Sequence, residues 1–408
     1  MGVAELRVLL YSIEDSKIQP DWLMEHEKKE IIQGCNINFL LGSGLSMPYL
    51  KTLGNIEALL AGLEKLALDD GKKKLIQASL YKCFFDGVIS KNMGILNGEA
   101  DAKPVLESYK HFLQAWNCIL LRRKNTLLSK EVNIFTTNVD IFLDKALEDL
   151  SLEYNDGFNG RFQPVFSLSN FKKSRFKKSL HYDNVAEIPV FNLLKLHGSL
   201  SWESLGNEIA FSRDLHLIKQ VADITIDTAH ILTVADDATL ASLQTAAAAK
   251  TFGPTTDAFM KKYEELLIVN PTKEKFKDTL LKETHYEHLR LYSNELEKEN
   301  TILYVMGFSF ADEHIREITI RAANSNPTLL INVIAHNSKA KTEIEAKFLG
   351  AKVKNRNINF IAPPQEKAAT GTTTKDEYEY DLANINDKYF GGLFSGEDEM
   401  EHDGAAGP

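Results

Sequence analysis

The first residues whose types and spacing could do chemistry are two glycines near the start of the chain. Gly42-Ser43-Gly44 directly follows the apolar run NINFLL. Glycines at the end of a strand let backbone amides approach a pyrophosphate closely, and a helix beginning there adds the positive end of its dipole. The usual dinucleotide fingerprint has a third glycine where Met47 stands here. A tight strand-to-helix turn without a ligand explains the same residues, so both interpretations stay open.

Polar side chains with hydrogen-bonding capacity follow the second apolar run, EVNIF. Thr137, Asn138 and Asp140 supply a hydroxyl, an amide and a carboxylate within four positions. Such a set can bind a sugar or an amide-bearing ligand. The alternative is that these residues cap the helix that follows, which is a common use of Thr, Asn and Asp.

A histidine ends the third apolar run. His197 stands in Lys195-Leu196-His197-Gly198, and histidine is the natural general base near neutral pH. A single histidine at a strand end is also commonly structural. The later runs end in further candidates that carry little weight singly, namely Gly307, Ser309 and Asn337.

The elements that must position these residues are strands that read apolar nearly throughout. Strands covered on both faces have this character, and strands separated by helices build a doubly wound α/β fold. In that fold, ligands bind at the carboxyl ends of parallel strands, which is where the candidate residues stand. The strands are expected at Asn36–Gly44, Glu131–Asp140, Ile188–Ser199, Glu265–Pro271, Thr301–Ser309, Thr328–Asn337 and Asn357–Pro363.

The organisation that follows is a Rossmann-like core with additions. Residues 1–30 form an N-terminal lead, and residues 31–364 form the core. Large, mainly helical insertions interrupt the core at about 51–130 and 201–300, with residues 201–263 irregular. The polar, acidic tail at 365–408 is expected to be disordered.

Composition limits the classes of function. The 408 residues carry a formal net charge of −10, which disfavours constitutive nucleic-acid binding. The basic cluster Phe171–Ser179 is interpreted as a solvated loop or helix end. His285 and His288 have one-turn spacing that could seat a metal, but a solvated helix face is the simpler interpretation.

The cysteines favour a reducing compartment. Cys35, Cys83 and Cys118 lie far apart and form no C-x-x-C pair, so local spacing offers no zinc ribbon. No apolar stretch reaches the ~18 residues of a membrane span. We therefore expect a cytoplasmic protein with no membrane segment.

The order of the candidate segments resembles the sirtuin family. Sirtuins have a glycine-Ser-glycine turn, a Thr-Asn-x-Asp strand end, a His-Gly strand end, a Gly-x-Ser segment and a late strand ending in Asn. The resemblance covers roughly residues 30–50, 130–145, 190–200 and 300–362. The phrases IVNPTKEKF and GFSFADEHI are similar to those of sirtuin-related proteins of bacterial anti-phage defence.

The resemblance implies an NAD site with assigned roles. Asn138 and Asp140 would face the nicotinamide ribose and amide, with Thr137 beside them, and His197 would be the base near the ribose hydroxyls. The remaining residues would line the pyrophosphate (Gly42, Ser43, Gly44 and Ser46) or hold the adenosine half (Gly307, Ser309 and Asn337).

The chain also departs from the sirtuin pattern. Thr137 stands where sirtuins usually carry Gln, and Met47–Lys51 replaces a Gly-Ile-Pro-x-Phe-Arg segment and lacks its arginine. The four cysteines of the sirtuin zinc ribbon, which helps to form the acyl-peptide cleft, are absent from the sequence. These differences weigh against protein deacylation.

The resulting hypothesis is an NAD hydrolase. It would use NAD as substrate, without a metal, and release nicotinamide and ADP-ribose as a gated, NAD-depleting effector of anti-phage defence. The resemblance further implies a homo-oligomer that acts with a hexameric DNA-translocating ATPase, without itself binding nucleic acid. The alternatives are an NAD-dependent protein deacylase and a non-catalytic sensor of NAD or ADP-ribose.

Overall fold

The computed structural model describes residues 31–52, 54–123, 127–270, 279–351, 353–367 and 374–394. The predicted lead at 1–30 and the last part of the predicted tail, 395–408, lie outside these ranges. Among the described residues, no helix combines the length and apolar character needed to cross a membrane.

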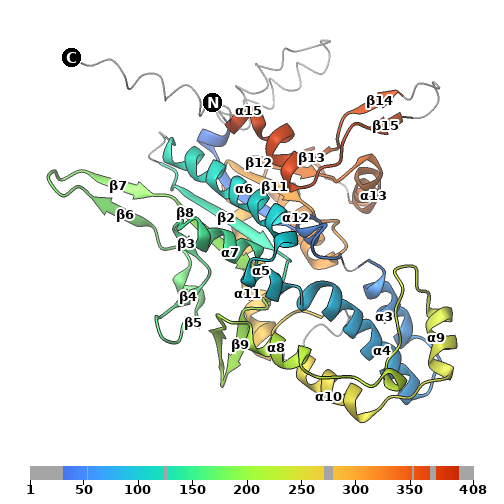
Figure 1. The fold of residues 1–408 in the computed structure, drawn as a ribbon. Coiled ribbons are helices and arrows are strands. Elements are labelled where there is room, and N and C mark those ends of the chain that lie inside the picture. Colours follow the sequence, from blue (N-terminus) through green and yellow to red (C-terminus); the bar gives the residue numbers. More distant parts are fainter. Residues whose placement is uncertain are drawn as a thin grey trace.

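The centre of the fold is a seven-stranded sheet in which every neighbouring pair is parallel. This confirms the predicted α/β, Rossmann-like, doubly wound sheet (Figure 1). After β1 the chain builds one half of the sheet, and from β11 onward it builds the other. Ligands of such folds bind at the carboxyl ends of the two strands where the order reverses. The spatial order is β13 (Ile358–Ile361), β12 (Leu329–Ile334), β11 (Thr301–Met306), β1 (Asn36–Leu41), β2 (Glu131–Thr136), β8 (Val190–Lys195) and β3 (Tyr154–Asn155).

The central strands are buried on both faces, as their composition predicts. Every residue of β8 and β11 is buried. The polar exceptions satisfy one another, because Asn133 donates to Asn38 across β1 and β2, and Asn192 donates to Asn133 across β2 and β8, each at 2.9 Å. These asparagines are register partners, so a row of hydrogen-bonded amides crosses the sheet, although the buried Nδ2 of Asn38 has no hydrogen-bond partner.

Helices cover both faces of the sheet (Figure 1). On one face Phe39 of β1 packs edge-on against Trp116 of α6 (Lys103–Leu121), with ring centroids 4.9 Å apart. On the other face Phe135 of β2 meets Tyr292 of α11 at 5.0 Å. The helices of the first face are α6 and α7 (Phe142–Asp149), and those of the second are α11 (Thr279–Leu296), α12 (Glu313–Ser325) and α13 (Ser338–Phe348).

The two predicted insertions pack against each other. Tyr81 of α4 stacks on Tyr263 of α10 at 4.9 Å, and Phe85 contacts Phe259 at 5.9 Å. Residues 201–263 were expected to be irregular, but they form regular elements because they bury an apolar face against the first insertion. The elements of the two segments are α3 (Ile56–Glu64), α4 (Asp70–Phe84), η2 (Phe85–Ile89), α5 (Asn92–Asn97), η3 (Ala100–Ala102), β9 (Trp202–Leu205), β10 (Glu208–Phe211), α8 (His216–Ala222), η5 (Thr228–His230), α9 (Leu240–Ala248) and α10 (Pro254–Tyr263). The strands β9 and β10 pack away from the lobe that the helices of these segments form, in a small sheet with β4 (Phe158–Asn159) and β5 (Val165–Phe166).

The predicted strand at Glu265–Pro271 is wrong. Among its described residues, 265–270, only Ile268 makes a bridge, an antiparallel one to Gly198, and the seventh strand of the sheet is the two-residue β3. Leu266, Leu267 and Ile268 are buried because the segment crosses the end of β8. The apolar composition of this segment therefore predicted its burial correctly, but the segment does not pair with the strands of the central sheet.

The prediction of a disordered tail from residue 365 is wrong for its described part. Phe390 is fully buried and packs edge-on against Trp116 at 5.4 Å, and Leu382 and Ile385 also join the core. These apolar residues anchor an otherwise polar segment. Its elements are β14 (Gln365–Lys367), β15 (Thr374–Asp376), α14 (Leu382–Asn384), η6 (Ile385–Tyr389) and α15 (Gly391–Phe394).

Two small sheets lie beside β3 and β8. In one, β4 (Phe158–Asn159) and β5 (Val165–Phe166) pair with β10 and β9. The other is a hairpin of β6 (Arg175–Lys178) and β7 (Val185–Ile188) that extends away from the body (Figure 1). Four of the nine residues of the basic cluster at 171–179 therefore form the exposed strand β6, where the sequence predicted a loop or helix end, and the short turn η4 (Leu168–Asn170) precedes the cluster.

Candidate active site

The glycine turn lies where the strand order reverses. The amide of Gly42 donates to the carbonyl of Met306 at 2.9 Å, and the amide of Gly44 donates to that of Gly307 at 3.0 Å. A Cβ on Gly42 would stand 2.4 Å from the Gly307 oxygen. Gly307 itself has φ of 63°, which favours glycine. The loops after β1 and β11 can therefore touch only because both carry glycine.

The turn is not followed by the expected α-helix. Residues Ser43–Ser46 form the 3-10 turn η1, which is too short to develop a substantial dipole. Ser43 is exposed and Gly44 is half-buried, whereas Ser46 is buried. The first two can face a ligand, but the Ser46 side chain points into the protein.

Ser46 joins a buried network of polar side chains. Its hydroxyl donates to Oδ2 of Asp140 at 2.8 Å and lies 3.1 Å from the Tyr109 hydroxyl on α6. Asn138 donates from Nδ2 to the Gly42 carbonyl at 3.2 Å and to Ser46 at 3.3 Å. The amide oxygen Oδ1 of Asn138 is buried and has no hydrogen-bond partner. One acceptor of this network is thus left available.

The loop after β2 is shaped by its own side chains. Thr136 accepts a hydrogen bond from the Asn138 amide at 3.0 Å, and Oδ1 of Asp140 accepts one from the Phe142 amide at 3.1 Å. The capping alternative is therefore partly realised, since Asp140 supports the start of α7 with one oxygen. The other carboxylate oxygen of Asp140, Oδ2, accepts the hydrogen bond from the Ser46 hydroxyl. Thr137 is half-buried and uses its amide to bond Leu41 at 3.1 Å.

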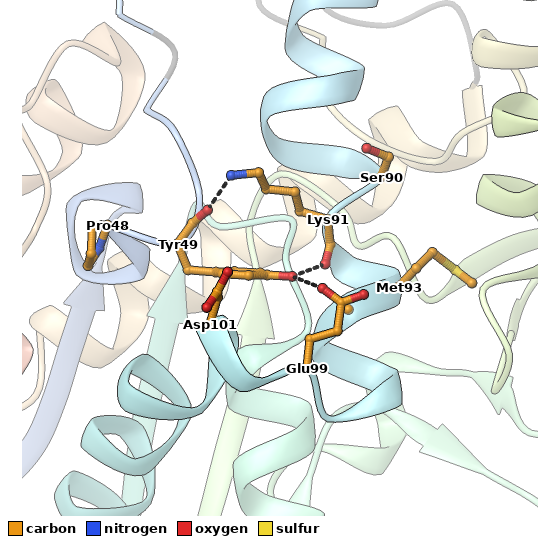
Figure 2. Close-up of a pocket in the computed structure, with 8 residues that line it drawn as sticks. Pro48, Tyr49, Ser90, Lys91, Met93, Glu99 and Asp101 are labelled. Atoms are coloured by element: carbon orange, nitrogen blue, oxygen red, sulfur yellow. Dashed lines mark hydrogen bonds between the residues drawn. The ribbon is translucent and has the colours of Figure 1, made fainter.

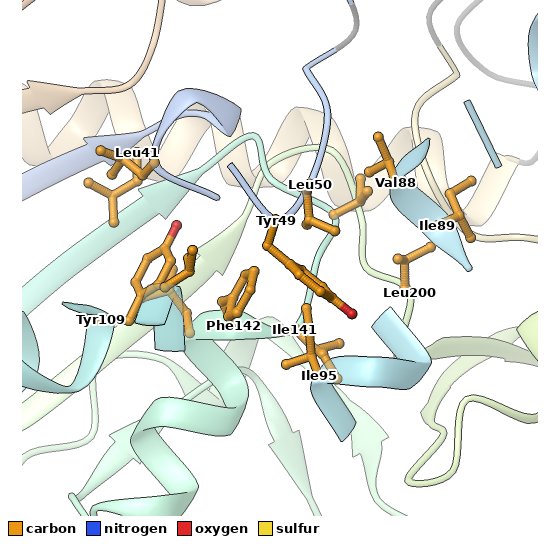
Figure 3. Packing of buried hydrophobic residues seen from close by; sticks show 14 of the residues in the cluster. Leu41, Tyr49, Leu50, Val88, Ile89, Ile95, Tyr109, Ile141, Phe142 and Leu200 are labelled. Atoms are coloured by element: carbon orange, nitrogen blue, oxygen red, sulfur yellow. The ribbon is translucent and has the colours of Figure 1, made fainter. Parts of the chain in front are cut away.

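The segment after the glycine turn is fixed by packing. Tyr49 and Leu50 enter the core beside Ile141 and Phe142 (Figure 3), and Phe142 stacks on Tyr109 at 5.5 Å. This is the stretch that lacks the sirtuin arginine. Its side chains are held by apolar contacts, and its backbone is held by hydrogen bonds such as that from the Leu50 amide to the Ser46 carbonyl at 2.9 Å. The buried network therefore lies on a well-packed part of the core.

Lys195 is a site residue that sequence reasoning did not select. Its ammonium is buried at the end of β8, 2.5 Å from the Asp144 carboxylate, 2.5 Å from the Asp140 carbonyl and 3.1 Å from Ser199. Burial raises the pKa of Asp140, while Lys195 and the bond from Ser46 act in the opposite direction. A lysine closing an otherwise apolar strand was the available signal, because a buried charge requires a partner.

His197 is paired with an acidic residue from another loop. Its Nε2 lies 3.3 Å from Oδ2 of Asp312, although this nitrogen is buried and makes no hydrogen bond. Asp312 also caps α12 by accepting from the amides of His314 and Ile315. In the sequence, Asp312 ends the polar segment Gly307 to Asp312 that follows a predicted strand, but the sequence pattern assigns no role to it. The geometry makes it the residue that can orient the imidazole.

The backbone on both sides of His197 is held in place by contacts with residues 267–269. Gly198 has φ of 77°, and a Cβ there would stand 2.1 Å from the Leu267 carbonyl oxygen. The Val269 amide donates to the His197 carbonyl at 2.8 Å. Residues 265–270, where the sequence predicts a strand, therefore cover the end of β8.

His285 and His288 are buried, which corrects their interpretation as a solvated face. Their Nδ1 atoms lie 2.6 Å from the Leu196 carbonyl and 3.1 Å from the Lys195 carbonyl, so each Nδ1 donates. Burial lowers the pKa of His288 to about 4. The two imidazoles of α11 thus clamp the end of β8 rather than face solvent, and the imidazole of His288 does so in its neutral form.

Asn138 and His197 emerge from the same edge of the sheet. Each stands two residues beyond the registered pair Thr136 and Lys195 of adjacent strands. The Leu200 amide also bonds the Val139 carbonyl at 3.0 Å, which ties the two loops together. The topology therefore places both residues at the carboxyl-terminal edge of adjacent strands.

The predicted adenosine-side residues are more dispersed. Gly307 meets the glycine turn, but Ser309 is exposed and its carbonyl accepts from Lys347 at 2.7 Å. Asn337 caps α13, accepting from the Ala340 amide at 2.9 Å. Its side-chain oxygen is thus engaged, and the structure does not bring it to the network around Ser46.

A cavity of about 420 Å³ lies beside Pro48 and Tyr49 (Figure 2). Tyr49 donates to the Lys91 carbonyl at 2.9 Å, and burial together with nearby Glu99 raises its pKa to about 12. The lining, which includes Asp101, contains neither Asn138 nor His197. The cavity is therefore separate from the site at the strand ends, which contains Asn138 and His197.

No group of three or more His, Cys, Asp or Glu side chains is placed to hold a metal ion within the described ranges. Comparisons with models of known families and with curated proteins find no match.

Proposed function

We propose that this chain hydrolyses NAD at the bond between nicotinamide and ribose, giving nicotinamide and ADP-ribose. One observation carries the proposal. The Asn138 amide oxygen is buried without a hydrogen-bond partner, the His197 imidazole stands beside the Asp312 carboxylate, and both Asn138 and His197 follow strands that end at the edge where the glycine turn lies. Unpaired buried polar atoms are costly, and a ligand or water normally satisfies them.

The chemistry assigns each group a role. The bond between the ribose C1′ and the nicotinamide nitrogen breaks with its electron pair going to nicotinamide, which leaves cationic character on the sugar. A water oxygen then bonds to C1′ and loses its proton to His197. Asn138 accepts a hydrogen bond from that water or a ribose hydroxyl through Oδ1. Asp312, whose Oδ2 lies 3.3 Å from Nε2, orients the imidazole.

The glycine turn accounts for the other half of the substrate. Ser43 and Gly44 are accessible at the switch between β1 and β11, where backbone can approach a pyrophosphate. Ser46 and Asp140 act indirectly, since both are buried and hold Asn138 in place. They are positioning residues in this mechanism.

The test is product analysis with purified full-length protein and NAD, by mass. Asn138→Ala and His197→Ala should each reduce nicotinamide release by about 100-fold or more. Exposed residues of the same types, Asn159→Ala and His216→Ala, serve as matched controls. Activity retained in both site variants refutes the assignment. Tight NAD binding by an inactive wild-type chain favours the sensor alternative, and release of acyl groups from a peptide favours the deacylase.

The resemblance supplies the proposed setting: a cytoplasmic, NAD-depleting defence effector that forms homo-oligomers and acts with a hexameric DNA-translocating ATPase. The two insertions pack into one lobe, which we propose as a lid and assembly surface. Turnover with and without the ATPase tests the gating. Full activity of the isolated chain would contradict it.

A further inference from the structure

The β6–β7 hairpin concentrates exposed apolar side chains on one projecting element (Figure 1). Leu180 is 95% exposed, Tyr182 73%, Phe176 61% and Val185 58%. Phe176 and Val185 share a face, because they stand two pairs of the ladder apart with Glu187 and Lys178 opposite them. Apolar side chains gathered in this way mark an interaction surface.

The hairpin is fixed at its base. Ser174 donates to the Glu131 carboxylate at 2.9 Å, and Arg175 forms an ion pair with Glu153. Only Pro189 separates β7 from β8 of the central sheet. A two-stranded hairpin is marginal alone in water, so this anchoring preorganises an arm whose tip stays available. Preorganisation lowers the entropic cost of binding.

The charge of the arm identifies the kind of surface that it fits. Residues 171–188 contain five basic and two acidic residues, a net charge of +3, whereas the whole chain carries −10. All other residues of a second copy together therefore carry −13. Lys178 is already paired with Asp183, and apolar side chains occupy the tip, which suits a protein surface better than a phosphate backbone.

We propose that the β6–β7 hairpin is a dimerisation arm that docks, through Leu180 and Tyr182, on the acidic body of a second copy of this chain. A closed pair in which each copy offers one arm and receives the other uses both surfaces equally. The inference rests on the homo-oligomer of the proposed function and adds the surface that forms it; it does not depend on the NAD chemistry, which product analysis tests separately.

The test is sedimentation equilibrium of the full-length chain over a micromolar dilution series at low and high salt. The double variant Leu180→Ser/Tyr182→Ser should weaken self-association at least about 30-fold, and salt should weaken it in the wild type. Leu349→Ser is the matched control, since Leu349 is 84% exposed beyond α13. Unchanged circular dichroism verifies folding.

A monomeric wild-type chain overturns the proposal. So does an oligomer that the double variant leaves as tight as the control, or an arm that binds a short DNA duplex while the chain stays monomeric.

Discussion

Gly42→Ala would force apart the two loops that meet at the switch point. The new Cβ would stand 2.4 Å from the Gly307 oxygen and 2.7 Å from the Phe308 Cα. Both are backbone atoms, so no rotamer change can make room. Ordinary van der Waals contact needs the loops to separate by about 1 Å, which would stretch the 3.0 Å bond from Gly44 to Gly307 beyond hydrogen-bonding distance.

The expected cost combines two terms. Overpacking against a closely packed interior costs about 1–3 kcal/mol, and losing one backbone hydrogen bond costs about 1 kcal/mol. A destabilisation of about 2–4 kcal/mol lowers the melting temperature by about 2–5 °C in a chain of this size. Under the proposed function, NAD hydrolysis falls by about 100-fold, since a 1 Å misplacement has that effect on positioned groups.

Thermal melting followed by fluorescence, together with product analysis, measures both effects. Gly34→Ala is the matched control, because a Cβ there meets nothing within 4 Å. If Gly42→Ala has the same melting temperature as Gly34→Ala and keeps its activity, the close contact of the two loops is not a property of the protein in solution.

Two further predictions concern the end of β8. Lys195→Met should destabilise the fold by about 3–5 kcal/mol, since the Asp144 carboxylate loses its buried partner. Urea unfolding measures this change in the free energy of unfolding. A decrease no larger than that caused by the exposed control Lys339→Met contradicts the prediction. His288 should make the protein acid-sensitive, because its folded pKa of about 4 lies below the unfolded value of 6.5. Its contribution, up to about 3 kcal/mol, is present above pH 6.5 and is lost as pH falls to 4. His288→Phe should flatten that part of the stability profile, and an unchanged slope would count against a buried neutral imidazole.

Sequence reasoning performed well for the central strands because their composition reflects burial directly. Residues 36–41, 131–136, 190–195 and 301–306 lie in the middle of the sheet, where both faces exclude water. It failed at 265–271, an equally apolar run that crosses the end of β8. It also missed β3, since two residues offer no periodic pattern.

For the candidate site as well, some residues could be identified from the sequence and others could not. Residues selected by their place after a strand, such as Asn138 and His197, do lie at one edge, because parallel strands place their carboxyl ends together. Asp312 and Lys195 were passed over, since their importance depends on contacts with residues far away in the chain. The buried environment of His285 and His288 was invisible for that reason as well.

By itself, the sequence determined the alternation of buried strands and helices, and with it the parallel sheet and the edge where polar residues gather. Local composition suffices there, because burial on two faces demands apolar residues at every position. Only the tertiary structure decided which polar atoms are paired and which are left over. That outcome depends on distances between segments separated by up to hundreds of residues, such as His197 to Asp312 and Gly42 to Gly307, and no local pattern encodes those distances.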